Sequence, residues 1–220
     1  MSALAFDVSH FLAGTIVLLS LSLLYQDRLP PLINIFAVQS LVLALSIAWQ
    51  AQTQGASHLL ITAGIELCFK AAIIPYVLYR LIRHLKIHRT VETVVGIGPT
   101  MIAGMALIGL SMALMMRATS GIGEMAREDL AFALCVILLG LLMMVTRRNA
   151  VSQVIGFMSI ENGLVLAATG AKGMPFVVET FVAFSVLIAL IVIGVFLFRI
   201  RERFDTVDVA MLDRFRGERR

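Results

Sequence analysis

Long apolar runs, separated by short polar stretches, dominate the pattern of this 220-residue chain. A helix needs about 20 mainly apolar residues to cross the hydrocarbon core of a bilayer, because it rises about 1.5 Å per residue. About seven runs reach that length, at 8–25, 31–51, 57–81, 93–117, 130–146, 151–170 and 175–199. The pattern therefore predicts an all-α, polytopic integral membrane helix bundle of about seven transmembrane helices.

The composition supports the same class. Hydrophobic residues make up 60% of the chain, charged residues 15%, and the mean hydropathy is +0.95. Soluble domains have about 45–50% apolar and about 25% charged residues. The excess of apolar residues exceeds what one soluble core needs, so a lipid environment is expected.

The loop charges predict an orientation. Most of the 18 lysines and arginines lie in alternate connections and the tail: Arg28; Arg80, Arg83, Lys86 and Arg89; Arg147 and Arg148; and the arginines from Arg199 onward. The intervening connections carry Arg117, Arg127 and Lys172. Because cytoplasmic loops are enriched in Lys and Arg, we expect the N-terminus outside and the C-terminus in the cytoplasm. The net charge of +4 thus serves topology and contact with membrane lipid, not nucleic-acid binding.

A weak tandem repeat is also visible. The segment at 35–45 aligns with 156–168, which places Gln39 opposite Glu161. We therefore expect four parts: an N-terminal three-helix unit at 1–90, a linker helix and outer loop at 91–128, a second three-helix unit at 129–200 and a cytoplasmic tail at 201–220.

Several ionisable or amide side chains fall inside the predicted spans: Gln39, Glu66, Lys70, Glu161 and Glu179. An ionisable group at the bilayer centre costs several kcal/mol unless it is paired or hydrated. Such groups usually face a bundle interior or a water pathway. We therefore treat these five as candidate proton-path residues.

Glu66 and Lys70 lie four residues apart, so their side chains share one helix face. They are interpreted either as an internal ion pair or as a pair in which Lys70 exchanges a proton and Glu66 balances it. Pro75 removes a backbone donor shortly afterwards and is expected to bend the helix near the lysine.

Glu161, followed by Asn162, has no cation within one turn of its own helix. A protonatable group without a local counter-ion suits a relay better than a structural pair. Glu179 lies near the outer end of its predicted helix, where a structural role is equally compatible. Gln39 is compatible with a simple hydrogen bond between helices.

Motifs for bond-making chemistry are missing from the sequence. Cys68 and Cys135 have no metal-ligand or redox spacing, and no nucleophile–base pair or phosphate-binding loop is present. Three small residues, Gly96, Gly104 and Gly109, predict close helix approach instead. We therefore expect no catalytic residue, no metal and no cofactor.

The segment RRNAVSQVIGFMSIENGLVLAA (147–168) resembles the second helix of the NuoK subunit of respiratory complex I and of related cation/proton antiporter subunits. The wider chain is similar to hydrogenase-4 component E, the HyfE family of membrane hydrogenase and formate hydrogenlyase complexes. The similarity lies in AVQSLVLAL (37–45), FKAAIIPYVL (69–78), the 147–168 segment and DTVDVAMLDRF (205–215).

This resemblance implies a subunit of an oxidoreductase complex that is not catalytic by itself. It would sit among large antiporter-like membrane subunits in the bacterial inner membrane, with 129–200 as a NuoK-like unit. Glu161 matches the family's intramembrane glutamate and Lys70 its helix-three lysine. The position of a second NuoK glutamate falls near Ala189 and Leu190, where no acid is present.

Three functions remain open at this point. The chain is expected to be a proton-conducting subunit of a redox-driven complex, a subunit of a multisubunit cation/proton antiporter, or a stand-alone transporter or purely structural membrane adaptor. A transporter usually has broken helices around a midplane substrate site, and Pro75 is the one sequence sign of a break. No small-molecule substrate other than protons or another cation is expected.

Overall fold

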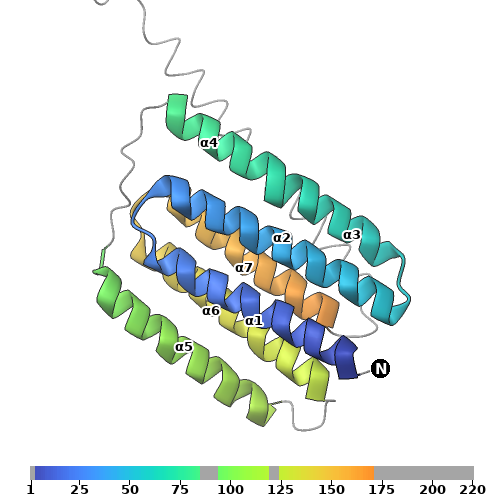
Figure 1. Ribbon diagram of the computed structural model, residues 1–220. Helices are drawn as coiled ribbons and strands as arrows, with labels where there is room; N and C mark the ends of the chain where they lie inside the picture. Colours follow the sequence, from blue (N-terminus) through green and yellow to red (C-terminus); the bar gives the residue numbers. More distant parts are fainter. Residues whose placement is uncertain (1–2, 85–93, 119–123, 171–220) are drawn as a thin grey trace, which may run out of the picture.

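The computed structural model describes residues 3–84, 94–118 and 124–170, which form a bundle of helices (Figure 1). In chain order they are α1 (Ala3–Tyr25), α2 (Leu29–Gln54), α3 (His58–Glu66), the π-helical segment η1 (Leu67–Ile73), α4 (Ile74–His84), α5 (Ile97–Ala118), α6 (Glu124–Thr146) and α7 (Ala150–Gly170). Because α3, η1 and α4 are continuous, they form one long helix, which we call the α3–η1–α4 rod.

The predicted helical membrane bundle is confirmed. Six helices in the described part of the chain are long and apolar enough to cross a membrane. The expected seventh span at 175–199, which contains Glu179, and the tail at 201–220 lie outside the described residues.

The helix ends differ from the predicted ones. Helices expected to begin at 8, 31 and 130 begin at Ala3, Leu29 and Glu124 instead. Apolar windows stop at the first charged residues, whereas a helix can continue into the polar boundary because its backbone hydrogen bonds do not require apolar side chains. As a result, residues between the predicted spans at 93–117 and 130–146, including Asp129, belong to α6.

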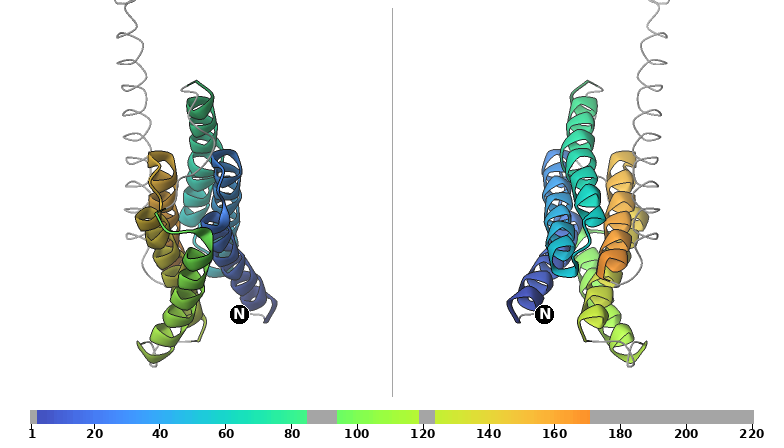
Figure 2. Two further views of the ribbon diagram at one scale, coloured as in Figure 1. Left: turned by 90° about the vertical axis from the view of Figure 1, so that its left-hand side faces the viewer. Right: turned by 90° about the vertical axis from the view of Figure 1, so that its right-hand side faces the viewer.

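Among the described helices, four form the centre of the bundle and the others flank it. α1 packs on α2 and α6, while α7 packs on α6 and α2. The rod formed by α3, η1 and α4 lies against α2 on one side, and α5 covers α6 and α1 on the other (Figures 1 and 2). The helices that the repeat equates, α1 with α6 and α2 with α7, are thus neighbours, while the repeat itself and the four-part division stay predictions.

The outer surface of the bundle is apolar, as expected for contact with lipid tails. Phe11, Ile61, Ile102 and Val145 are all exposed. On α5, the buried residues are Thr100, Gly104 and Ser111, so most of its apolar side chains face outward among the described residues. A surface of this kind would be a liability in water but is the ordinary lipid-facing surface of a membrane bundle.

Local sequence signals explain why the central helices begin and end where they do. α2 begins with prolines at its first positions, after Arg28 in an extended conformation. It ends at Gln54 and is capped by Gly55, whose φ of 68° lies in the left-handed region that glycine tolerates. α7 begins after Asn149, whose Oδ1 accepts a hydrogen bond from the Val151 N–H at 2.9 Å.

Glycines allow α6 and α7 to approach closely. Gly156, Gly163 and Gly170 recur every seven residues, and Gly140 of α6 lies against Gly156. A Cβ atom at Gly163 would lie 3.0 Å from the Ala133 carbonyl oxygen. The helices can therefore pack backbone to backbone, as small residues commonly permit in membranes.

Among the described residues, close approach is found at one of the three glycines for which it was predicted. A Cβ at Gly104 would lie 3.1 Å from Leu24 and 3.3 Å from Leu139. At Gly109 it would meet no described atom within 4 Å, and at Gly96 it would meet only Pro99 of the same segment. The prediction was therefore wrong for Gly96 and Gly109 within the described part of the chain.

Candidate functional site

A buried lysine joins two carboxylates from different helices. The Lys70 Nζ on η1 lies 3.1 Å from Glu66 Oε1 and 3.5 Å from Glu161 Oε2 on α7. It also donates a hydrogen bond to Asn162 Oδ1 at 3.1 Å. None of these four residues is more than 4% exposed. The ammonium group therefore connects the α3–η1–α4 rod to α7 near the middle of both spans.

The π-helical segment presents Lys70 at this position. η1 spans Leu67–Ile73, and the Ile74 N–H donates to the Phe69 carbonyl five residues earlier. Pro75 follows directly and has no N–H to donate, so a regular α-helical ladder would be interrupted here in any case. The irregularity predicted near the lysine thus takes the form of a widened helical turn, a feature often found at functional sites.

Amides and hydroxyls extend the cluster across α2 and α1. The Asn162 Nδ2 donates to Ser40 Oγ at 3.4 Å and to Gln39 Oε1 at 3.5 Å. Gln39 Nε2 donates to Ser20 Oγ on α1 at 2.7 Å and to Ser159 Oγ on α7 at 3.0 Å. All of these polar groups are buried. A continuous polar core therefore runs through four helical segments of an otherwise apolar bundle.

Four of the five predicted site residues meet in this cluster. Glu66, Lys70 and Glu161 are in contact, and Gln39 reaches them through Asn162. Glu161 has no cation on its own helix, as the sequence indicated, but it gains one from η1. Glu179 lies outside the described residues, and the functional roles of all five stay predictions.

Three serines of the cluster were not predicted. Ser20, Ser40 and Ser159 supply hydroxyls to the amides of Gln39 and Asn162. Serine is an ordinary residue in membrane helices, so each carries no signal by itself. Of the three, Ser159 is the one that the sequence could have indicated, because it lies near Glu161 in the same segment.

Arg147 does more than set topology. It is 1% exposed, and its Nη2 donates to the Leu24 carbonyl at 2.6 Å, near the C-terminus of α1. Burial lowers the pKa of this guanidinium, while the charge of Asp27 raises it. A cation at a helix C-terminus is favourable because the last carbonyls carry partial negative charge. The α6–α7 connection is thereby fixed to α1.

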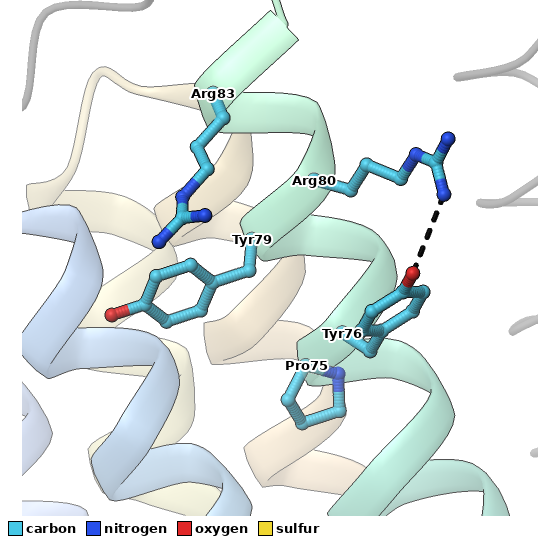
Figure 3. Close-up of a pocket in the computed structure, with 5 residues that line it drawn as sticks. All are labelled: Pro75, Tyr76, Tyr79, Arg80 and Arg83. Carbon is cyan, nitrogen blue, oxygen red and sulfur yellow. Dashed lines mark hydrogen bonds between the residues drawn. The ribbon is translucent and has the colours of Figure 1, made fainter.

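A surface pocket of about 480 Å³ lies at α4, lined among the described residues by Pro75, Tyr76, Tyr79, Arg80 and Arg83 (Figure 3). Arg80 Nη1 donates to the Tyr76 hydroxyl at 3.3 Å, and the Arg83 guanidinium lies 5.8 Å from the centre of the Tyr79 ring. Aromatic and basic residues together are typical of a membrane–water boundary. The pocket is not part of the buried cluster.

The described residues contain no group of three or more His, Cys, Asp or Glu side chains placed to hold a metal ion. Cys135 is buried and Cys68 faces the outside of the bundle, and both are free thiols.

Comparison with known proteins gives the family. Hydrogenase-4 component E of Escherichia coli K12 is 30% identical over 210 residues, covering 94% of this chain and 96% of that protein. The chain belongs to the hydrogenase-4 component E family. The counterpart in Shigella flexneri matches to the same extent. An uncharacterized protein of Mycobacterium tuberculosis is 29% identical over 211 residues, with 94% of each chain covered.

No family model and no solved structure matches the chain. The resemblance to the hydrogenase-4 component E family, carried by scattered segments of the sequence, is nevertheless confirmed over most of the length. The family relationship and the apolar helices together identify the chain as a multi-pass membrane protein.

Proposed function

We propose that this hydrogenase-4 component E homologue is a non-catalytic membrane subunit of a group 4 membrane hydrogenase or formate hydrogenlyase-type complex, related to complex I, and that it contributes to proton translocation. One observation carries the proposal. A single buried ammonium group, that of Lys70, lies between the carboxylates of Glu66 and Glu161 on separate helical segments.

The charge balance of this cluster favours proton exchange. Among the described residues, the cluster contains one lysine and two carboxyls, and with the lysine charged these three groups are neutral together when one carboxyl carries a proton. An uncompensated charge inside a bilayer costs several kcal/mol, so a neutral arrangement of these groups is favoured. A charge that arrives in a neighbouring subunit would change the charge balance around the cluster. It would thereby favour transfer of the proton from the carboxyl group to another group.

The surrounding amides suit a relay because they hold Lys70 between its partners. Asn162 accepts a hydrogen bond from Lys70 and is itself held by Ser40 and Gln39. In this proposal Glu161 exchanges the proton, Lys70 transmits the change in charge, and Glu66 balances the lysine. Glu179 remains a candidate for a further step.

Family membership supports the assembly proposed here. The relatives are named as a component of hydrogenase-4, so we propose that this chain binds other membrane subunits, including large antiporter-like ones. It would lie in the bacterial inner membrane with its N-terminus outside. The chemistry of hydrogen would take place on other subunits.

Replacing Glu161 with Gln tests the function in the intact complex. Glu161→Gln keeps the shape of the side chain but cannot exchange a proton, so proton transport into inverted vesicles should fall by about tenfold or more. Transport is measured with a pH-sensitive dye during enzyme turnover. Hydrogen production from a reduced viologen dye reports in parallel that the redox subunits are present and active.

Asp7→Asn is the control, because Asp7 is an exposed carboxylate on α1 and its change should leave transport intact. Co-purification of the other membrane subunits checks assembly of both variants. If the Glu161→Gln complex assembles fully and transports protons at the normal rate, the cluster is structural and the proposed function is wrong.

A further inference from the structure

A second buried polar group lies at the end of the bundle that holds the N-terminus. Asp129, in the second turn of α6, is only 4% exposed. Its Oδ2 accepts a hydrogen bond from Gln50 Nε2 on α2, at 3.5 Å. Gln54 Nε2 donates to Gln50 Oε1 at 2.8 Å and to the Thr169 carbonyl at 3.2 Å. The carboxylate is therefore held where α2, α6 and α7 meet.

The packing around Asp129 is tight. A Cβ atom at Gly170, the last residue of α7, would lie 2.7 Å from Asp129 Cβ and 3.0 Å from its Oδ2. The aspartate thus lies directly against the α7 backbone, in space that any other residue at 170 would occupy. Burying a carboxylate costs free energy unless it is compensated, so the burial of Asp129 in this tight packing needs a functional or structural reason.

α2 connects this aspartate to the central cluster. Its buried polar residues are Gln39, Ser40, Ser46 and Gln50. Gln39, Ser46 and Gln50 are spaced by seven and four residues, so they lie along one face of the helix. From Gln39 to Gln50 the helix rises about 16 Å. Polar groups therefore follow one buried face from the Lys70 cluster toward the end of the bundle.

Ionisable groups continue from Asp129 to the surface. The neighbouring Glu128 forms an ion pair with His10 of α1, with 2.8 Å between Oε2 and Nδ1. Both side chains are substantially exposed, at 39% and 48%. The His10 ring contacts Phe6 and Phe132, which hold it beside α6. Histidine is the side chain best suited to proton shuttling between a protein and water.

We propose that Asp129 is the proton-exchange residue at the N-terminal end of the bundle, linking the Lys70 cluster to the membrane surface along the polar face of α2. This inference rests on the proposed function. Gln50 positions the carboxylate, and the His10–Glu128 pair supplies or receives the proton at the surface. The transfer requires a chain of several waters along this face, because Gln39 and Ser46 are about 10 Å apart along the helix axis.

Two substitutions of Asp129 in the intact complex test the inference. Asp129→Asn keeps the shape but removes the exchangeable proton, so transport into inverted vesicles should fall by about tenfold or more. Asp129→Glu retains the carboxyl group and should restore a substantial part of the rate. Asp7→Asn, which removes an exposed carboxylate from α1, should leave transport unchanged.

The outcomes separate this inference from the proposed function. If Glu161→Gln abolishes transport but an assembled Asp129→Asn complex transports normally, Asp129 is not on the path although the central cluster is. If Asn and Glu at 129 reduce transport equally in assembled complexes, the role of Asp129 is structural. Normal transport by both Glu161→Gln and Asp129→Asn would overturn the proposed function itself.

A measurement on the unaltered complex covers the case in which the Asp129 variants do not assemble. Dicyclohexylcarbodiimide modifies protonated carboxyl groups in apolar surroundings. Mass spectrometry should find the modification on Asp129, with a parallel loss of transport. Modification of Glu161 without any modification of Asp129 would overturn the inference.

Discussion

At the scale of single residues, Lys70 is the cation that contacts both buried acids of the cluster. Its ammonium lies within 3.5 Å of carboxylate oxygens from both Glu66 and Glu161. Removing one member of a buried ion pair usually costs about 3–5 kcal/mol, because the remaining charge is left uncompensated. The other members of the cluster therefore decide how severe the loss of the lysine is.

We expect Lys70→Met to destabilise the protein strongly, and we expect the double variant Lys70→Met/Glu66→Gln to recover part of that loss. The second change removes one of the two acids that the lysine balances. Thermal unfolding of the purified complex in detergent should rank the midpoints as unaltered protein, double variant, single variant.

The control is Arg117→Met, which removes an exposed cation at the end of α5 and should change the midpoint little. A double variant that is less stable than Lys70→Met alone would show that the two carboxylates do not compete for the lysine.

The candidate site was predictable to the extent that its members stand out in an apolar sequence. Glu66, Lys70 and Glu161 are rare residue types inside such runs, and their spacing predicted the Glu66–Lys70 pair. The contact of Lys70 with Glu161 joins different helices, so it was not predicted. Asp129 was not predicted to be buried, because it lies outside the apolar run that begins at residue 130. Its burial depends on the early start of α6 at Glu124 and on packing against Gly170, neither of which an apolar window can reveal.

At the scale of helices, the α6–α7 pair is defined by backbone contact. Gly140, Gly156 and Gly163 leave no room for a Cβ atom between these helices. The seven-residue spacing of the α7 glycines is visible in the sequence, but a spacing alone does not say which helix the face meets. The π-helical form of η1 was likewise beyond prediction, since Pro75 indicates a disruption without specifying its geometry.

We expect Gly163→Ala to destabilise the bundle by about 1–3 kcal/mol, the usual cost of overpacking. The new Cβ would lie 2.7 Å from Ile137 Cγ1 and 3.0 Å from the Ala133 carbonyl, so α6 and α7 must move apart. Thermal unfolding in detergent measures the effect.

Gly109→Ala on α5 is the matched control. A Cβ there meets no described atom within 4 Å, so the better helix propensity of alanine should leave stability unchanged or raise it by up to about 1 kcal/mol. Equal unfolding midpoints for the two variants would mean that the close α6–α7 contact does not contribute to stability.

At the scale of the whole molecule, the two polar regions occupy different depths of one bundle. The Lys70 cluster lies near the middle of its helices, while Asp129, Gln50 and the His10–Glu128 pair belong to the first turns of α6, the last turns of α2 and the first turns of α1. These helix ends lie together at the end of the bundle that holds the N-terminus (Figure 1). Arg147 and the α1–α2 connection lie at the opposite end. The direction in which the proposed path opens therefore depends on how the bundle is oriented in the membrane.

The positive-inside rule places the Asp129 end outside, and cysteine labelling tests this orientation. In a variant with Cys68 and Cys135 replaced by Ser, a cysteine at Ser57 lies in the α2–α3 connection, and one at Asp27 lies in the α1–α2 connection. A membrane-impermeant thiol reagent applied to intact cells should label position 57 strongly and position 27 only after the membrane is permeabilised. The reverse pattern would place the Asp129 end in the cytoplasm, so that any proton exchange at Asp129 would draw on the cytoplasm instead. Labelling of both positions in intact cells would show mixed orientation, which a path with a fixed direction does not allow.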